Sequence, residues 1–397
     1  MLFFSANVWE SLHFIVFLQH KTNVNMMESY IWQKQGWPKM YWDDSQLCGL
    51  LANVNTLRGR LAGRLSMFGF KEQEESVLDS MTMEIASSAG IEGEILDHDS
   101  VRSSVARHLG LSHAGLPVPD HYTEGVVDIM VDATANHDKT IDDERLFAWH
   151  SALFPTGRSG MYKINVGAWR CGEEPMQVVS GPLGHQKVHY EAPPCEAVPE
   201  MMDAFLQWLD NDSKDIDPLV KAAIAHLWFV TIHPFDDGNG RLCRTITELL
   251  LSRADHSSQR YYSLSAEILN KRNSYYQHLE EAQKGELDVT AWIMWFLETL
   301  KKAVETALEK TERVVMKKKF WDVYQDLPLN DRQRKVLNML LDGFEGKLNS
   351  SKWYKINHCS QDTATRDIND LIHKGILRKT DDGGRSTNYE LVFEELA

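Results

Sequence analysis

The chain has 397 residues, which exceeds a single typical domain and predicts two or three, and its 43% hydrophobic residues suffice for a substantial core. Its 42 Lys and Arg against 57 Asp and Glu give a formal net charge of −15, which argues against a general binder of nucleic acid or anionic membranes. Its five cysteines are scattered without a CxxC pair, so we expect reduced thiols in a cytoplasmic protein rather than a disulfide framework.

The first residues, 1–27, are expected to form an extension outside the folded domains. Their apolar runs, Leu2–Phe4 and Phe14–Leu18, are too short to span a bilayer, and no basic stretch precedes them as in a secretory signal. We therefore expect no membrane anchor in this part of the chain.

Residues 28–115 are expected to form an N-terminal helical domain. Near its end, Ser88 and Glu92 are four positions apart, so they lie one turn apart on a predicted helix. Gly93 would end that helix, because glycine readily adopts the left-handed conformation of a helix terminus. From this pattern alone, Glu92 could be an ordinary exposed residue at a helix end.

Residues 116–312 are expected to form the core domain. Early in it stands a β-prone run that predicts one strand of a surface hairpin. The run consists of Met176, Gln177, Val178, Val179 and Ser180, with Gly181 after it. Further on, apolar residues recur at helical spacing from Leu219 to Ile232 and predict a buried helix.

The stretch His233-Pro-Phe-Asp-Asp-Gly-Asn-Gly-Arg-Leu-Cys-Arg244 carries most of the chemistry in the sequence. The preceding helix should stop near His233, because Pro234 disfavours the α conformation in the residue before it. His233 would thus be a titratable base at the point where a rigid helix gives way to a loop.

The loop that follows is suited to binding phosphate. Gly238-Asn239-Gly240 can turn its backbone N–H groups inward as an anion nest, and a second helix, predicted from Arg241 to Arg253, would point its N-terminal end at the same anion. Arg241 and Arg244 lie on one face of that helix, within reach of one polyphosphate. Asp237 is placed to hold a magnesium ion that bridges phosphate oxygens. The alternative is an ordinary turn.

Residues 329–397 are expected to form a separate C-terminal module, joined to the core by a linker helix at 313–328. Helices are predicted at 329–341, 351–356 and 360–375, followed by strands at 376–379 and 388–392 around a turn with Arg385. Three helices followed by a hairpin resemble a winged helix-turn-helix, whose third helix enters a DNA groove. The many Asp residues of the module leave open whether its partner is DNA or a protein.

Position for position, His233-x-Phe235-x-Asp237-Gly238-Asn239-Gly240-Arg241-x-x-Arg244 resembles the signature of the Fic family, most of whose members transfer AMP from ATP to a hydroxyl side chain of a target protein. The resemblance implies a mainly α fold with a helical Fic core. It implies that His233 is the general base, that Asp237 binds Mg²⁺, and that the nest with Asn239 holds the phosphates. Arg241 would contact the β-phosphate and Arg244 the γ-phosphate.

The run Ser88-Ala-Gly-Ile-Glu92-Gly93 resembles the inhibitory motif of the same family. The resemblance implies that Glu92 pairs with Arg244 and denies that arginine to the γ-phosphate, with Ser88 steadying the turn. Because the motif lies N-terminal to the core, the chain resembles the self-inhibited class of the family. A related alternative is an enzyme that also removes AMP, with Glu92 helping a water to attack.

The run 176–181 resembles the flap of the family, which pairs with the backbone of the target as an added strand, although an ordinary surface hairpin is the alternative. Tyr275 or Tyr276 would line the adenine pocket. The implied partner is a protein with a Ser, Thr or Tyr hydroxyl, and the family resemblance also makes a homodimer possible. A second hypothesis for the whole chain is a DNA-associated regulator whose Fic core responds to nucleotide.

Overall fold

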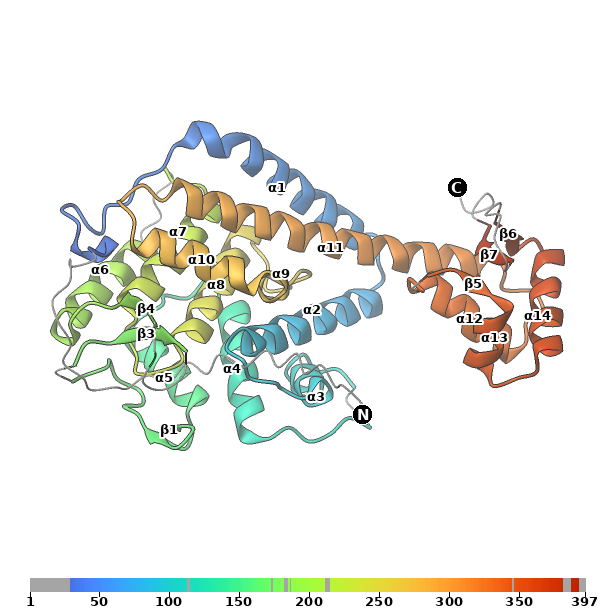
Figure 1. Ribbon diagram of the computed structural model, residues 1–397, viewed down its shortest axis with the longest axis horizontal. Coiled ribbons are helices and arrows are strands. Elements are labelled where there is room, and N and C mark those ends of the chain that lie inside the picture. Colours follow the sequence, from blue (N-terminus) through green and yellow to red (C-terminus); the bar gives the residue numbers. More distant parts are fainter. Residues whose placement is uncertain are drawn as a thin grey trace, which may run out of the picture. The chain divides into compact units, whose positions relative to one another are not determined.

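The computed structural model describes residues 29–112, 115–172, 174–181, 185, 187–210, 215–344, 346–380 and 387–392. The mainly α fold expected from the sequence is confirmed, since helices make up most of the described chain and its strands are few and short (Figure 1). The expected extension, 1–27, and the turn with Arg385 lie outside the described residues.

The chain divides into two compact units, and the division falls after Glu305, inside helix α11 (Thr290–Val323). Helix α11 is continuous across residue 312, where we predicted that the core ends and a linker helix at 313–328 begins. No Gly or Pro occurs within α11, so nothing in the sequence ends the helix there. Its last turns already belong to the second unit, where Phe320 is buried in the core.

The first unit consists of helices with two small antiparallel hairpins between α5 and α6. Its helices are α1 Asp44–Leu65, α2 Phe70–Ile91, α3 His98–His108, α4 His121–Ala135, α5 Asp143–Leu153, α6 Val198–Asp210, α7 Pro218–Ile232, α8 Asn239–Asp255, α9 Leu264–Asn270 and α10 Arg272–Gln283, with 3₁₀ turns η1 Ile31–Gln33 and η2 Cys195–Ala197. Its strands are β1 Arg158–Ser159, β2 Tyr162–Lys163, β3 Gln177–Ser180 and β4 Lys187–Glu191. The predicted boundary at 115/116 falls in the loop between α3 and α4, inside this one unit.

Helices α7 and α8 pack against each other and fix the loop 233–238 at both ends. Every residue of α7 after Pro218 is buried except Lys221, so other elements must cover the helix on nearly all sides. The side chain of Asp217 caps α7 by accepting a hydrogen bond from the N–H of Leu219 at 2.8 Å. Helix α8 begins two residues before the predicted start, so Asn239 lies in its first turn.

Helix α2, which carries the Ser88 run, is joined to α9 through one buried carboxylate. Glu84 is 3% exposed and accepts hydrogen bonds from the backbone N–H of Ser265 at 2.9 Å, from the Ser263 hydroxyl at 2.7 Å and from the Ser265 hydroxyl. The first N–H groups of a helix have no partner inside it, so the carboxylate satisfies a donor that α9 leaves unpaired. This contact attaches α2 to the start of α9.

The hairpin of β3 and β4 contains the predicted flap. A bulge interrupts its pairing between Val178 and Val179. Met176, which we expected to contact the target protein, is 7% exposed and packs with Tyr30 and Tyr190 in a small apolar cluster. Met176 is therefore a packing residue, and the local β-prone pattern could not show this because Tyr30 is distant in the sequence.

The second unit has the three helices and the strand pair predicted for the C-terminal module. They are α12 Asp331–Leu341, β5 Leu348–Asn349, α13 Ser350–Asn357, α14 Gln361–His373, β6 Leu377–Lys379 and β7 Asn388–Leu391. The strands form one antiparallel sheet in the order β5-β7-β6, over a core that includes Trp353, Ile368 and Leu371. The assignment of this unit to the winged helix-turn-helix class stays a prediction.

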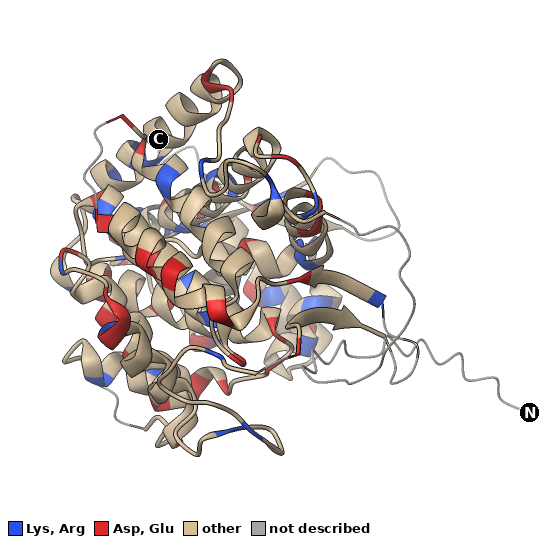
Figure 2. Cartoon of the chain, turned by 90° about the vertical axis from the view of Figure 1, so that its left-hand side faces the viewer, with Lys and Arg blue, Asp and Glu red and all other residues tan. Residues whose placement is uncertain are grey.

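The charged residues are distributed over many helices rather than confined to one segment of the sequence. Figure 2 shows acidic and basic positions interspersed along the ribbon. Some of them are paired inside the fold, as where the buried guanidinium of Arg260 contacts Glu248 at 2.8 Å. Among the helices that the structure describes, none is both long enough and apolar enough to cross a membrane.

Replacing Glu84 with Ala should lower the free energy of unfolding of the first unit by about 2–4 kcal/mol, because buried donors at the start of α9 lose their acceptor. Urea unfolding followed by circular dichroism measures the loss as a lower midpoint with an unchanged slope. Glu74→Ala, at an exposed position of the same helix, should change the value by less than about 0.5 kcal/mol. Equal effects of the two substitutions would contradict the anchoring role of Glu84.

Candidate functional site

His233 ends helix α7 in a left-handed backbone conformation, with φ 53° and ψ 58°. Residues other than glycine adopt this conformation infrequently, so the surrounding structure has to hold it. Arg170 is 5% exposed, and its Nε donates to the carbonyl oxygen of His233 at 2.8 Å and its Nη2 to that of Ile232 at 3.4 Å. These carbonyls lie at the C-terminal end of α7, where a positive charge is favourable.

The imidazole of His233 is held as a neutral base. Its Nδ1 lies 3.2 Å from the carbonyl oxygen of Val230. Since a carbonyl can only accept a hydrogen bond, Nδ1 carries the proton and Nε2 has the lone pair. Desolvation by the surrounding protein lowers the pKa of His233 to about 4, so the ring is neutral near pH 7. His233 can therefore take up a proton at Nε2.

The side chain of Asn239 clamps the loop between α7 and α8. Its Oδ1 accepts a hydrogen bond from the N–H of Phe235 at 2.9 Å, and its Nδ2 donates to the Phe235 carbonyl at 2.8 Å. Asn239 is 2% exposed and Phe235 is fully buried. We expected Asn239 to hold phosphate; its side chain instead makes two hydrogen bonds to the backbone of Phe235, and contact with phosphate stays a prediction.

Gly238 and Gly240 allow a close approach to the start of α8. Gly238 has φ +81°, and a Cβ on it would lie 2.9 Å from the ring of Phe154. A Cβ on Gly240 would lie 2.1 Å from Oε1 of Glu92, well inside contact distance. An anion is favoured at a helix N-terminus, and the carboxylate of Glu92 lies against the first turn of α8.

Arg244 is 1% exposed and is held by the end of α2. Its Nε donates to the Ser88 hydroxyl at 2.8 Å, and its Nη2 donates to the Ser88 carbonyl at 2.9 Å and to Oε1 of Glu92 at 2.8 Å. Its Nη1 is buried without a hydrogen-bond partner among the described residues. Helix α2 ends here, with Glu92 as its cap and Gly93 at φ +83° after it. The fold thus brings the Ser88 run against Arg244.

Arg241 has a different set of partners. Its Nη1 lies 3.2 and 3.1 Å from the two carboxylate oxygens of Glu94 and donates to the hydroxyl of Tyr122, which itself donates to Glu94. Its Nη2 lies 3.9 Å from Oδ1 of Asp237. The guanidinium lies 5.1 Å from the ring centre of Phe154. Burial raises the pKa of Tyr122 well above its ordinary value, so its hydroxyl stays a donor.

Asp237 is the carboxylate of this loop that could hold a divalent cation. Its side chain is 39% exposed, and it accepts hydrogen bonds from the N–H of Gly238 at 2.6 Å and from the hydroxyl of Ser159 on β1. Within the described residues, no three or more His, Cys, Asp or Glu are grouped to hold a metal ion by themselves. A single carboxylate fits Mg²⁺, which binds proteins through one or two carboxylates together with substrate phosphates and water.

His150 of α5 braces the same loop. Its Nδ1 accepts a hydrogen bond from the N–H of Gly167 at 3.1 Å, so Nε2 carries the proton and donates to the carbonyl of Asp237 at 3.2 Å. Its ring stacks on Phe235, with the ring centroids 4.3 Å apart. Burial lowers the pKa of His150 to about 4, which keeps the ring neutral and this arrangement intact near pH 7.

The two tyrosines expected at the adenine differ in their surroundings. Tyr275 is 2% exposed, and its hydroxyl lies 2.9 Å from Nε2 of the buried His226, so it is a core residue. Tyr276 is only partly buried, and its hydroxyl donates to the carbonyl of Ile91 at 3.3 Å, next to Glu92. Contact with the adenine therefore stays a prediction for Tyr276 alone.

The flap hairpin is connected to α10 through His189. Its Nδ1 lies 2.7 Å from Oε2 of Glu280, and its Nε2 lies 2.5 Å from the hydroxyl oxygen of Ser180. The remaining predicted docking residues are at least partly exposed: Gln177, Val178, Val179, Ser180 and Gly181. Their contact with a target protein stays a prediction.

Several residues of the site were missed from the sequence. Arg170, His150 and Tyr122 are distant in the sequence from the two motifs and carry no local signal of their roles. The sequence did contain one indication of Glu94: it is a second carboxylate two positions after Glu92, next to the predicted inhibitory run. Their contacts depend on tertiary packing, in which α2, α4 and α5 lie against α8.

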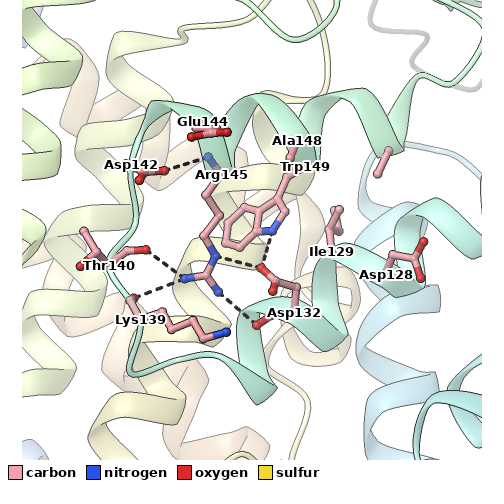
Figure 3. A pocket seen from close by; sticks show the side chains of 11 residues that line it. Asp128, Ile129, Asp132, Lys139, Thr140, Asp142, Glu144, Arg145, Ala148 and Trp149 are labelled. Atoms are coloured by element: carbon pink, nitrogen blue, oxygen red, sulfur yellow. Dashed lines mark hydrogen bonds and ion pairs between the residues drawn. The ribbon is translucent and has the colours of Figure 1, made fainter.

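A pocket of about 470 Å³ between α4 and α5 lies apart from these residues (Figure 3). None of its lining residues belongs to the stretch from 233 to 244. Its arginine, Arg145, donates to the carboxylate of Asp132 at 2.8 Å and to the carbonyls of Lys139 and Thr140 at 3.3 Å. The guanidinium is thus already satisfied by the protein, which makes the pocket a poor phosphate site.

Residues 140–251 match the Fic/DOC family, and residues 30–111 match a domain of unknown function, DUF4172. The chain therefore contains a Fic domain, which includes the stretch from 233 to 244. A crystal structure of a Fic family protein from Desulfovibrio desulfuricans G20 has a TM-score of 0.51 at 23% sequence identity, and the match covers 90% of this chain and 98% of that one. The helical fold is accordingly that of Fic proteins.

Two curated relatives each align with part of the chain. Protein adenylyltransferase fic-1 of Caenorhabditis elegans is 38% identical over 93 residues, which are 23% of this chain and 17% of the relative. Protein adenylyltransferase Fic of Nematostella vectensis is 30% identical over 120 residues, which are 30% of this chain and 26% of the relative. The chain thus aligns with well under two thirds of the length of either relative.

Replacing Asn239 with Ala should loosen the loop between α7 and α8, because the buried N–H and carbonyl of Phe235 lose their partners. The expected loss in free energy of unfolding is about 2–4 kcal/mol. Hydrogen–deuterium exchange read by mass spectrometry should become faster in peptides covering 233–240, with unchanged exchange in α14 of the second unit. Unchanged exchange at 233–240 would contradict the clamping role.

Proposed function

We propose that the chain is a protein adenylyltransferase, which transfers AMP from ATP to a hydroxyl side chain of a target protein. The observation that carries the proposal is a neutral base, His233, beside a glycine-lined helix N-terminus with two buried arginines. Nε of Arg241 and Nη1 of Arg244 are buried donors without a hydrogen-bond partner in the described part of the chain. Phosphate oxygens would supply the acceptors that these nitrogens lack. The names of the curated relatives support the same activity.

In the proposed reaction His233 is the general base. The oxygen of the target hydroxyl attacks the α-phosphorus of ATP while the hydroxyl proton moves to Nε2 of His233. A bond forms between that oxygen and the α-phosphorus, the bond from the α-phosphorus to the oxygen that bridges to the β-phosphorus breaks, and pyrophosphate leaves. Backbone N–H groups at the start of α8 stabilise the phosphate charge, with Arg241 at the β-phosphate and Arg244 at the γ-phosphate.

Asp237 is the residue that would hold Mg²⁺ together with the phosphates of ATP. When bound, the ion would neutralise charge on the α- and β-phosphates. Ser159 and Gly238 donate hydrogen bonds to the Asp237 carboxylate and so orient it. His150 holds the backbone of the same residue through its carbonyl.

Glu92 would keep the site inactive. Its carboxylate occupies a donor of Arg244 and lies against Gly240 at the start of α8. The γ-phosphate would need the same arginine, and the negative carboxylate would repel it. ATP would then bind with its phosphates displaced from the line of attack until Glu92 moves away. A bifunctional enzyme, in which Glu92 also helps a water to remove AMP, would use the same residues.

The partners of the chain are proposed from the family and from its exposed elements. The flap would pair with the target backbone, and a homodimer is a further expectation. Binding of DNA by the second unit has less support, because α14 exposes Asp362 beside Arg366, and Arg332 is paired with Asp367 at 2.7 Å. We therefore keep AMP transfer as the proposed function.

Replacing Glu92 with Gly should raise the rate of AMP transfer at least about tenfold, because Arg244 becomes available to the γ-phosphate. Incubation with radiolabelled ATP, scored on the chain itself and on lysate proteins, measures the change. Glu74→Gly, on the exposed face of the same helix, is the matched control and should leave the rate low. Unchanged labelling by Glu92→Gly would contradict inhibition by this residue. Labelling that persists in Glu92→Gly with His233→Ala would contradict the general base.

The rate of the Glu92→Gly variant should be nearly constant from about pH 6 to pH 8 and fall below about pH 5. The reason is that the pKa of His233 lies at about 4, so the ring accepts a proton until the pH falls towards that value and protonates Nε2. The pH profile of kcat/KM at saturating Mg²⁺ measures this, with circular dichroism at each pH to check folding. An acid limb centred near 6.5, the ordinary value for histidine, would contradict the depressed pKa.

A further inference from the structure

Arg241 is held by a carboxylate and a phenol that lie outside the Fic motif. Glu94, three residues beyond the end of α2, contacts Nη1 with both oxygens, at 3.2 and 3.1 Å. The hydroxyl of Tyr122, from the start of α4, contacts both Nη1 and Glu94. The three side chains form a closed network around one end of the guanidinium, and Arg241 is 4% exposed.

Glu94 and Glu92 lie two positions apart, but they face different parts of the site. Oε1 of Glu92 lies 2.1 Å from the position of a Cβ on Gly240, at the start of α8, which is where phosphate is expected. Glu94 instead contacts Nη1 of Arg241, while Nη2 of the same guanidinium faces Asp237 and Nε has no partner in the described residues. Glu94 therefore occupies the end of the guanidinium away from Asp237 and leaves the other nitrogens to a ligand.

We infer that Glu94, together with Tyr122, is a positioning residue that holds Arg241 ready for Mg·ATP, and that its effect is opposite in sign to that of Glu92. The inference rests on the proposed function. A planar guanidinium bound at one end by a carboxylate keeps a defined orientation, so its remaining donors are aimed before the ligand arrives.

Asp237 provides the physical reason why Glu94 is needed. It is the other carboxylate that lies within 4 Å of Arg241 among the described ion pairs, at 3.9 Å. A buried guanidinium that loses Glu94 is attracted to the nearest remaining negative charge. Arg241 would then move onto Asp237 and compete with Mg²⁺ for the same oxygens. Glu94 thus keeps Arg241 and Asp237 apart and leaves the carboxylate of Asp237 for the cation.

The first test compares rates of AMP transfer in the uninhibited Glu92→Gly background. Adding Glu94→Gln should raise the KM for Mg·ATP about tenfold and change kcat less than about threefold, since orientation of the ligand is lost and the base is not touched. Adding Tyr122→Phe should change KM in the same direction by a smaller factor. Glu286→Gln removes an exposed carboxylate that pairs with Lys34, so it is the matched control and should leave both constants unchanged.

An increase of transfer on adding Glu94→Gln would overturn the inference, because Glu94 would then be a second inhibitory carboxylate. Unchanged KM would overturn it as well. If Glu92→Gly itself transfers no AMP, the proposed function fails, and the inference about Glu94 is then judged by binding alone.

The second test measures nucleotide binding without turnover, by calorimetry on chains with Glu92→Gly and His233→Ala. Glu94→Gln should weaken the binding of Mg·ATP about tenfold and the binding of ATP in EDTA by much less. The reason is that Arg241, once released from Glu94, competes with Mg²⁺ for the carboxylate of Asp237. Circular dichroism and the urea midpoint confirm that each variant is folded. Equal losses with and without Mg²⁺, or no loss in either, would overturn the inference.

Discussion

Arg241 and Arg244 are buried at the start of one helix, and each requires negative charge or acceptors inside the protein. A charge removed from water without a partner costs several kcal/mol, so a fold with these arginines must place acceptors against them. The last turn of α2 and the residues after it provide most of these acceptors: Ser88 and Glu92 for Arg244, and Glu94 for Arg241. This requirement is met only if the N-terminal helices and the Fic core fold as one unit, as they do.

The same requirement makes the position of α2 important along its whole length. A shift of one turn would remove Glu92 from Arg244 and leave a buried guanidinium without its carboxylate. Glu84 prevents such a shift from the side of α9, and Arg102 of α3 contacts Glu75 and Asp79 near the other end of the helix. The contact between Glu92 and Arg244 is therefore a consequence of how α2 is anchored, and the anchors contain none of the residues proposed to bind ATP.

The sequence predicted those parts of the site that depend on local spacing. The end of α7 at His233, the glycine-flanked start of α8 and the two arginines on one helix face follow from the order of residues. Spacing could not show which polar side chains are used internally, and so Asn239 was expected at phosphate although its amide is bonded to Phe235. The predicted boundary at 312 falls inside α11, where no glycine or proline ends the helix.

The fold also limits what could separate Glu92 from Arg244. A ligand shifts an equilibrium between two forms only by the difference in its affinities for them. The form with Glu92 in place leaves Arg241 and Asp237 able to bind part of ATP, so under the proposed function ATP would gain mainly the contact with Arg244 on release. That gain must exceed the cost of separating Arg244 from Glu92 and Ser88, which are already hydrogen-bonded to it at 2.8 Å. Under the proposed function, ATP alone would therefore be a weak activator, and an effective signal would act on α2 or its supports in α3 and α9.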